Sequence, residues 1–426
     1  MTSHLCKVLE KPVARQITDH LTKCNFTYEH QYGFRQNVGT MDAAAEIVTT
    51  VQKSLDLGLK SGCLFLDVKK AFDSVNHHIL VKKLVSAGIV ESALSWFRSY
   101  LSGRYQSALV NGVMSDSRLV KNGVPQGSVL GPLLFSIATN DLSNCKLNGR
   151  LVLFADDACV VYSSDELNDL LHFIQEDLIT LTDWYSRNGF SLNLSKTVYI
   201  LFSKNTINQV FPPVEVNGII IERVSSFKYL GLMLDERLSW ENHIDLIRKK
   251  VMPAVRILRR CRSMIHTNHL LTLYYSLIHS HFSYMAGIWG CASKTKLNLL
   301  QVIQNRSLKA IFKLPIRTPK RVLYSQSRVP PIANCIKISR SLLVFRSLTL
   351  NLHRSMFCLP ADPRYALRTV THLPKPRCWS TKYGIHGFTF TSIDTYNKLP
   401  PEVKNVNSYP AFKTGLKKYL YSVSLD

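Results

Sequence analysis

The fold is decided by one stretch of the sequence, LVLFADDACVVY at residues 151–162. Apolar residues stand on both sides of an acid pair, Asp156 and Asp157, which predicts a β-hairpin whose turn contains the two acids. A pair of aspartates is also a common turn sequence. Taken alone, the stretch therefore leaves two interpretations open, a plain turn or a functional site.

A third acid ends an apolar run further upstream. The run GCLFLDV at residues 62–68 predicts a buried strand with Asp67 near its end. Acids at strand ends are poorly placed for packing but well placed to converge over one edge of a sheet. We therefore expect Asp67, Asp156 and Asp157 to meet at one sheet edge. Three carboxylates repel one another unless cations lie between them, and oxygen ligands favour Mg²⁺. The pattern fits two Mg²⁺ ions, about 3.5–4 Å apart, in a phosphoryl-transfer site.

Between these acids lies a loop punctuated by glycine and proline, NGVPQGSVLGPLLF at residues 122–135. Gly127 has no side chain, so a backbone or a base can approach closely. Gln126 offers both a hydrogen-bond donor and an acceptor. The other interpretation is a simple turn with Ser128 as a helix cap, and the spacing is compatible with both.

Four segments resemble the motifs of reverse transcriptases, and they follow in the family's order. FLDVKKAFD at 65–73 resembles motif A, GVPQGSVLGPLLF at 123–135 motif B, and FADD at 154–157 motif C, while QYGFR at 31–35 is similar to the template-contacting segment upstream. The overall style resembles non-LTR (LINE or jockey-type) retrotransposons. The resemblance implies an α+β right-hand polymerase, with a palm, partial fingers and a helical thumb, followed by a basic, mainly helical C-terminal region.

The resemblance also implies the chemistry of the three acids. Asp67 and Asp156 are expected to hold two Mg²⁺ ions, with Mn²⁺ as an alternative, while Asp157 supports them and the Val68 carbonyl adds a ligand. The implied partners are an RNA template, a DNA primer or target, and dNTPs. In the implied reaction a primer 3′-hydroxyl attacks the α-phosphate of a dNTP and releases pyrophosphate.

Further roles carried over from the family concern the incoming nucleotide. Phe72 is expected to act as an aromatic gate against a ribose 2′-hydroxyl, and Gln126 and Gly127 are expected to lie near the nucleotide. Lys196, in LNLSKT at 192–197, matches the motif D lysine that helps to protonate pyrophosphate. Two plainer interpretations stay open, a core aromatic at the start of a helix for Phe72 and a solvated lysine before a strand for Lys196.

Template and primer contacts are expected on both sides of residue 234. Arg35 belongs to the QYGFR segment, and FKYLG at 227–231 is similar to the primer-grip hairpin, with Tyr229, Leu230 and Gly231 as candidates. By position, a helix over 242–262 is the thumb, and its Arg256, Arg259 and Arg260 are expected to contact phosphates. The alternative for residues 227–231 is an ordinary alternating strand, and the alternative for the helix is a basic face that is only solvated.

The charge of the chain is distributed very unevenly. The 426 residues hold 53 Lys and Arg against 29 Asp and Glu, a net charge of +24. Residues 251–426 contain 27 of the basic residues and only 4 of the acidic ones. Such an excess suits a polyanion, and nucleic acid is the first candidate, with acidic lipid or mere solubility as alternatives.

Other features narrow the setting of the protein. No stretch reaches 18 uninterrupted apolar residues, so we expect no membrane span. The ten cysteines form no CxxC pair, which indicates reduced thiols in an intracellular protein and argues against a zinc ribbon. The family resemblance implies action in the nucleus.

We expect fingers and palm over residues 1–234, with incomplete fingers, a thumb over 235–315 and a basic region over 316–426. The family's upstream endonuclease and the arginine-containing stretch of the fingers do not occur in the sequence given, so we expect either a truncated copy or an incomplete gene model of a longer polyprotein. Two functions remain, an RNA-directed DNA polymerase or a catalytically inactive derivative that only binds nucleic acid. An intron maturase is disfavoured because no paired-cysteine or His-Asn-His nuclease pattern occurs in the tail.

Overall fold

The computed structural model describes residues 3–207, 209, 211–350, 352–353, 355–357 and 372–423. The chain forms two compact units, and each is assembled from separate segments. The first unit contains Met1–Ala43, Lys60–Leu201 and Thr206–Val224, and the second contains Ala44–Leu59, Phe202–Asn205 and Ser225–Asp426.

The first unit is built on a five-stranded sheet with the strand order β11-β8-β1-β7-β6. Its strands are β1 (Lys60–Leu66), β6 (Arg150–Phe154), β7 (Asp157–Ser164), β8 (Val198–Phe202) and β11 (Glu222–Arg223). Strand β7 pairs antiparallel with both β1 and β6, and β11 runs parallel to β8. The predicted strand before Asp67 and the predicted hairpin around the acid pair are both confirmed.

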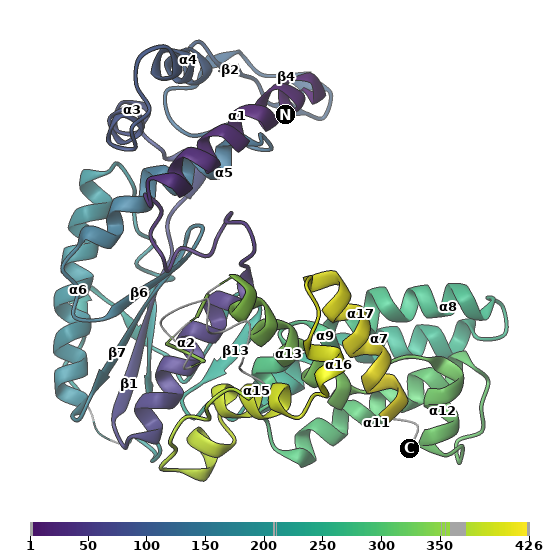
Figure 1. The fold of residues 1–426 in the computed structure, drawn as a ribbon. Coiled ribbons are helices and arrows are strands. Elements are labelled where there is room, and N and C mark those ends of the chain that lie inside the picture. The colour runs from purple at the N-terminus through teal and green to yellow at the C-terminus, as the bar shows by residue number, and fades with distance from the viewer. Residues whose placement is uncertain are drawn as a thin grey trace. The chain divides into compact units, whose positions relative to one another are not determined.

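Helices and short hairpins complete the first unit. They are α1 (His4–Lys23), η1 (Ala71–Asp73), α3 (His77–Ser86), α4 (Glu91–Leu101), α5 (Leu130–Thr139), η2 (Asn140–Asn144) and α6 (Leu167–Arg187), with β2 (Tyr105–Gln106), β3 (Leu109–Val110), β4 (Val113–Met114), β5 (Arg118–Leu119), β9 (Glu215–Val216) and β10 (Ile219–Ile220). Helix α6 lies along β1 and β7 (Figure 1). Its buried residues recur at helical spacing, as in Leu170, Ile174, Leu178 and Leu181, because one stripe faces the sheet.

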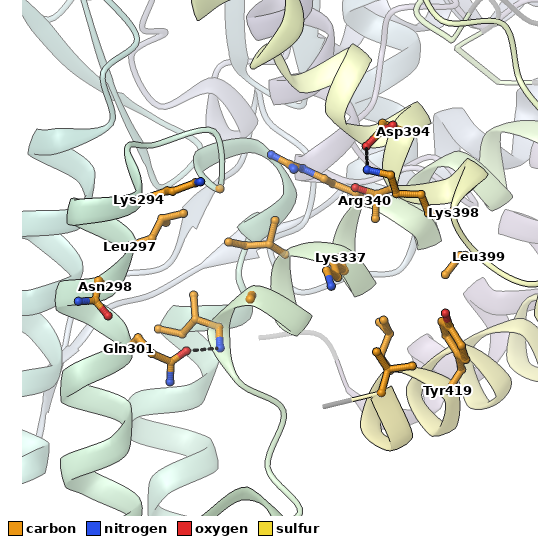
Figure 2. Close-up of a pocket in the computed structure, with 17 residues that line it drawn as sticks. Lys294, Leu297, Asn298, Gln301, Lys337, Arg340, Asp394, Lys398, Leu399 and Tyr419 are labelled. Carbon is orange, nitrogen blue, oxygen red and sulfur yellow. Dashed lines mark hydrogen bonds and ion pairs between the residues drawn. The ribbon is translucent and has the colours of Figure 1, made fainter. Parts of the chain in front are cut away.

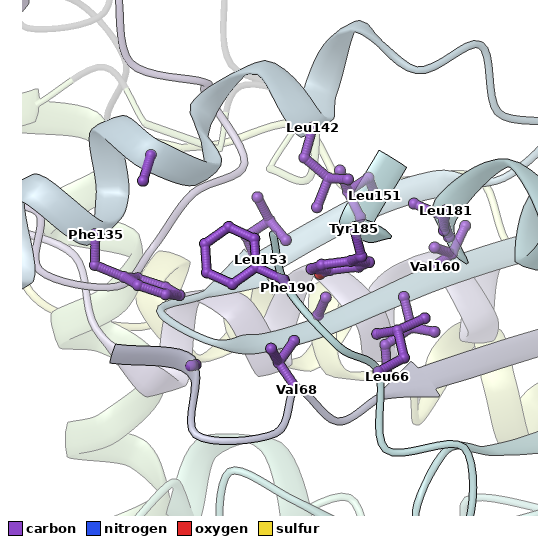
Figure 3. Packing of buried hydrophobic residues seen from close by; sticks show 14 of the residues in the cluster. Leu66, Val68, Phe135, Leu142, Leu151, Leu153, Val160, Leu181, Tyr185 and Phe190 are labelled. Atoms are coloured by element: carbon purple, nitrogen blue, oxygen red, sulfur yellow. The ribbon is translucent and has the colours of Figure 1, made fainter. Parts of the chain in front are cut away.

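The core of the first unit lies between this sheet and its helices. Figure 3 shows Leu66 of β1, Leu153 of β6 and Val160 of β7 in one layer with the rings of Tyr185 and Phe190. All of these side chains are buried. The ends of β1, β6 and β7 therefore rest on one packed layer, which fixes the positions of the acids that follow them.

The second unit is mainly helical. It contains most of α2 (Thr40–Asp56), the hairpin β12 (Ser226–Tyr229) and β13 (Leu232–Asp235), and the helical elements α7 (Glu241–Cys261), α8 (Thr267–Tyr274), η3 (Tyr275–His279), α9 (Ser280–Ser283), α10 (Ala286–Trp289), α11 (Lys294–Ile311), α12 (Lys320–Ser327), α13 (Ile332–Leu350), η4 (Thr381–Ile385), α15 (Phe388–Asn397), α16 (Pro401–Lys404) and α17 (Tyr409–Val423). Helix α13 is central to this unit, since α10, α15 and α17 all pack against it.

The architecture as a whole is α+β, as expected. Among the helices of the described residues, none combines the length and the apolar character that crossing a bilayer requires. Residues 358–371 of the expected C-terminal region lie outside the described residues. The division into fingers and palm, thumb and basic region stays a prediction.

Candidate active site

The acid pair occupies the turn between β6 and β7. The last pair of the ladder is Phe154 with Asp157, so Ala155 and Asp156 form the turn itself. Ala155 has a φ of +57°, a left-handed backbone that non-glycine residues seldom adopt. Asp156 and Asp157 are both exposed to solvent at this tip. The turn therefore presents two carboxylates outward from a rigid ladder.

Asp67 lies beside this tip because of the strand register. Leu66, the last residue of β1, pairs with Ala158, so the next residue on each strand is an aspartate. Burial, followed by the negative charges of Asp156 and then Asp67, raises the pKa of Asp157 from 3.8 to about 6. Although Asp157 keeps contact with solvent, its carboxyl group therefore senses both other acids. The structure brings the three predicted acids together.

The residue after Asp67 is held by an antiparallel bridge to Leu192. On either side of Val68, the Asp67 carbonyl accepts from the Asn193 N–H at 2.7 Å and the Lys69 N–H donates to the Ser191 carbonyl at 2.8 Å. Val68 and Leu192 thus form a non-hydrogen-bonded pair, in which the carbonyl of each residue points away from its partner. The sheet order places β7 on that other side of β1.

The donor set suits a hard divalent cation. The three acids and the Val68 carbonyl offer only oxygen, which is what Mg²⁺ prefers. No ion pair to any of the three acids occurs in the described part of the chain, so no cation there offsets the burial and the negative charges that raise the pKa of Asp157. Within the same residues, no group of three or more Asp, Glu, His or Cys side chains is arranged so that it could hold a metal ion by itself. Mg²⁺ usually keeps waters and substrate phosphates among its ligands, so an open set fits it.

The loop before α5 is organised around Gly123 and Ser128. Gly123 has a φ of +90°, and a Cβ there would lie 2.8 Å from the Asp73 backbone. The Gln126 amide donates to the Asp73 carboxylate at 2.9 Å, which fixes the exposed glutamine next to motif A. The Ser128 hydroxyl accepts from the Gly131 N–H at 2.9 Å, so the simple capping interpretation of Ser128 is correct locally. Gly127, also exposed, has a φ of +79° with nothing within 4 Å of its would-be Cβ.

Phe72 stands at the edge of the core rather than inside it. Its ring stacks on Phe135 with centroids 4.5 Å apart, and Phe34 meets it edge-on at 6.0 Å. The residue is half-buried, in the short helix η1 directly after the Asp67 loop. One face therefore serves packing, as the plainer interpretation expects, and the rest remains accessible.

Lys196 and Arg35 are exposed side chains on two loops of this unit. Lys196 lies in the turn before β8, whose Asn193 also binds the Asp67 carbonyl. The Arg35 guanidinium donates to the Glu29 carbonyl at 2.9 Å, which holds the arginine against its own loop.

Two residues have positioning roles that the sequence analysis did not predict. Gln31, buried within the QYGFR segment, accepts through its side-chain oxygen from the Ala155 N–H at 3.2 Å and from the Gly33 N–H at 2.8 Å. Gly33 packs so closely that a Cβ would lie 2.2 Å from the Ala155 nitrogen. This segment thus fixes the acid turn, a role that we did not expect from its resemblance to a template-contacting segment.

Glu10 is the second unexpected residue. It is 2% exposed on α1, and its carboxylate accepts from the Tyr100 hydroxyl at 2.9 Å and from the N–H groups of Val129 and Leu130. A carboxylate at a helix N-terminus satisfies unpaired N–H groups and the helix dipole. Glu10 therefore anchors the start of α5, directly after the Gln126 loop. Only a three-dimensional contact 119 residues apart in sequence reveals it.

The remaining candidates fall in the second unit. Tyr229, Leu230 and Gly231 form the β12–β13 turn, where Leu230 and Gly231 have φ values of +45° and +88°. The Tyr284 hydroxyl donates to the Leu230 carbonyl at 2.7 Å and so supports the turn.

Helix α7 presents a basic surface on that unit. Arg256, Arg259 and Arg260 are exposed, while Val255 and Leu258 on the same helix are buried. This pattern is that of an amphipathic helix with a basic outer face, and it suits both phosphate contacts and simple solvation.

Residues 1–234 match the family described as "Reverse transcriptase (RNA-dependent DNA polymerase)". The chain is 32% identical over 325 residues to a probable RNA-directed DNA polymerase from transposon BS of Drosophila melanogaster, with 74% of this chain and 36% of the relative covered. It is 28% identical to the RNA-directed DNA polymerase from mobile element jockey of Drosophila funebris, with 78% and 37% covered.

The chain thus spans little more than a third of the length of these curated relatives. Among solved structures, telomerase from Candida tropicalis in complex with the TWJ fragment of telomeric RNA aligns with 99% of this chain and 57% of its own. That alignment has a TM-score of 0.44 and 12% identity.

Proposed function

Because this chain belongs to the reverse transcriptase family, and to its non-LTR, LINE/jockey-type branch, we propose that it carries the catalytic palm of an RNA-directed DNA polymerase. The observation that supports this most is the convergence of Asp67 with the Asp156–Asp157 turn. Burial, and after it the charges of Asp156 and Asp67, raise the pKa of Asp157 to about 6. If Asp156 and Asp157 served only as a turn, a third acid at the end of another strand would not be needed beside them. The convergence favours the site over the turn.

The metal ions are part of this proposal. Reverse transcriptases use a divalent metal, and here Asp67, Asp156, Asp157 and the Val68 carbonyl would hold two Mg²⁺ ions. When bound, such ions supply electrostatic stabilisation of the charge that develops on the phosphate oxygens. Without cations, the three carboxylates repel one another, and this repulsion adds to burial in raising the pKa of Asp157.

Side chains around the acids are assigned to nucleotide binding, sugar selection and proton donation. We assign Gln126, fixed by Asp73, and Gly127 to the incoming nucleotide, where an amide orients the base pair and a missing side chain leaves room for it. Phe72, held by Phe135, closes the position of a ribose 2′-hydroxyl. Lys196 gives a proton to the pyrophosphate as its bond to the α-phosphorus breaks, while the primer 3′-hydroxyl loses its proton to solvent and bonds to the same phosphorus.

Nucleic-acid contacts follow from the second group of candidates. We assign the RNA template to Arg35, the primer to the turn at Tyr229, Leu230 and Gly231, and the duplex phosphates to Arg256, Arg259 and Arg260. A polymerase that extends a DNA target acts where chromosomal DNA is, so the proposal includes a nuclear location. The exposed basic face of α7 supports these phosphate contacts.

Primer extension tests the proposal directly. The purified chain is mixed with an RNA template, a DNA primer, Mg²⁺ and dNTPs, and compared with the Asp156→Asn variant. We expect extension by the wild type and its loss in the variant. If a folded wild type binds the template but extends nothing, the alternative holds, and the chain is an inactive derivative that only binds nucleic acid.

A further inference from the structure

The helical second unit contains a pocket that has no part in the proposed polymerase site. It has a volume of about 600 Å³ and lies among α11, α13, α15 and α17 (Figure 2). That volume is within the range of ordinary ligand pockets. Of its 17 lining residues, four are cationic and one is acidic: Lys294, Lys337, Arg340, Lys398 and Asp394.

Arg340 is the cation that requires an explanation. It is 7% exposed, its Nε donates to the Gly287 carbonyl at 2.9 Å, and one Nη approaches the Cys291 Sγ at 3.2 Å. In the described part of the chain, no carboxylate pairs with it. A buried guanidinium without an anion is costly, because burial removes its hydration. One interpretation is that Arg340 only ties α13 to the Gly287 segment, and the other is that a bound anion completes it.

The single acid of the pocket does not serve Arg340. Asp394 is bridged to Lys375 at 2.7 Å and to Lys398 at 2.6 Å, and Figure 2 marks the second of these pairs. Burial alone would raise the pKa of Asp394, but the hydrogen bonds from the two lysines outweigh it and lower that pKa. The carboxylate is therefore already neutralised. Lys294, Lys337 and Arg340 remain as three cations around the same space, with no acidic partner among the described residues.

The other walls of the pocket are apolar and aromatic. Leu297, Ile332, Ile336 and Leu399 line it together with the half-buried ring of Tyr419. A cationic side with an apolar and aromatic side is the chemistry that receives a phosphate and its attached base. Inorganic phosphate would leave the apolar walls unused, and a lipid would not need a cation as deeply buried as Arg340.

We propose that this pocket binds one nucleotide of a single-stranded nucleic acid, with the phosphate on Arg340, Lys337 and Lys294 and the base against Tyr419 and the apolar wall. The inference concerns a site other than the three acids and does not depend on polymerisation. The proposal assigns part of the positive charge of the C-terminal region to one specific contact with nucleic acid rather than to general electrostatic attraction. A free nucleotide shares this chemistry, so the experiment separates the two sources.

The test measures binding and contact together in the full chain. A fluorescein-labelled 12-nucleotide single-stranded RNA that carries one 5-iodouridine is titrated with protein in the absence of Mg²⁺ and dNTPs. The same sample is then irradiated, and the cross-linked residue is identified by mass spectrometry. We expect a cross-link at Tyr419. We expect Lys294→Glu and Lys337→Glu each to weaken binding about tenfold and to remove that cross-link.

A matched control separates a site from a basic surface. Lys320 is exposed at the start of α12 and lies outside the pocket, so Lys320→Glu should keep the Tyr419 cross-link and most of the affinity. Equal losses in Lys320→Glu and Lys337→Glu would overturn the proposal, as would a wild-type cross-link map without Tyr419. Competition with dAMP distinguishes the ligand source: if dAMP alone saturates the pocket and displaces the RNA at similar concentration, the strand assignment is wrong.

A variant of Arg340 tests whether this buried arginine binds the RNA. We expect the RNA to raise the melting temperature of the wild type, and to raise that of a folded Arg340→Met variant much less. An equal shift in the two proteins would assign Arg340 a purely structural role. Because no step in these assays needs nucleotide incorporation, a chain that fails primer extension can still pass them, and the reverse also holds.

Discussion

At the tip of the β6–β7 hairpin, the carboxyl group of Asp157 shares its surroundings with two other negative charges. Burial and the charges of Asp156 and Asp67 raise its pKa to about 6, whereas an aspartate in an unfolded chain titrates near 4. Between these two values the folded state holds more protons than the unfolded state. Stability therefore falls as the pH rises from about 4 to about 6, and the penalty persists above that range.

This sign leads to a prediction for Asp157→Asn. At pH 8 the variant should melt at a higher temperature than the wild type in EDTA, because the repelling charge is gone. The difference should shrink below pH 4, where Asp157 is protonated in both states. Mg²⁺ should raise the melting temperature of the wild type at pH 8 and affect the variant less. Thermal unfolding at pH 4, 6 and 8 tests this, and a variant that melts below the wild type at pH 8 would contradict it.

Gly33 offers a second prediction at the scale of one residue. A methyl group there would lie 2.2 Å from the Ala155 nitrogen, so Gly33→Ala must displace either its own loop or the acid turn. We expect primer extension to fall roughly 100-fold, since small displacements of catalytic groups have effects of that order. Gly39→Ala is the matched control, because nothing lies within 4 Å of its would-be Cβ. Extension near the wild-type rate in Gly33→Ala would show that the loop yields and the turn does not.

At the scale of elements, the sequence predicted the strands that depend on local apolar patterns but not the contacts between residues far apart in the chain. The apolar run before Asp67 and the apolar flanks of the acid pair predicted β1 and the β6–β7 hairpin, because strand burial is written in adjacent residues. The packing of Gln31 on Ala155 and the bond from Glu10 to α5 could not be predicted. A buried carboxylate in α1 reads as an ordinary helix residue until its partner, 119 residues later, is known.

The anchoring of α5 by Glu10 can be measured. Glu10→Ala leaves the N–H groups of Val129 and Leu130 without their acceptor, so we expect the free energy of unfolding to drop by about 2 kcal/mol. Tyr100→Phe removes only the hydroxyl bond to Glu10 and should cost about 1 kcal/mol. Lys11→Ala, an exposed change on the same helix, should be nearly neutral. Urea unfolding of the three variants gives the comparison, and equal losses in Glu10→Ala and Lys11→Ala would rule out the anchor.

For the whole molecule, the most informative feature is the place of α2. Its residues precede β1 in the sequence, yet those from Ala44 onward belong to the helical second unit. The Gln52 side-chain oxygen accepts from the Phe388 N–H at 2.8 Å, and the Asp56 carboxylate accepts from the N–H groups of Trp379 and Ser380. The C-terminal part of the chain therefore completes a helix that lies between the first two motif segments of the sequence.

Removing residues 372–426 should consequently damage more than the tail. Ile47, Val48, Val51 and Leu55 of α2 are each no more than 1% exposed, and Asp56 is 8% exposed. Truncation would uncover apolar surface around them and leave the Asp56 carboxylate without its three donors, Trp379 N–H, Ser380 N–H and the Ser380 hydroxyl.

We expect the amides of residues 44–56 to lose their protection against hydrogen exchange in the truncated chain, while those of β1 and β7 keep theirs. Asp56→Ala in the full chain is the milder version of the same change, and it should raise exchange in α2 and around residues 379–388 together. If α2 stays protected after truncation, its stability comes from elsewhere in the second unit. If instead both segments respond to Asp56→Ala, residues 379–388 and α2 stabilise each other, and substitutions in this part of the C-terminal region should loosen α2 as well.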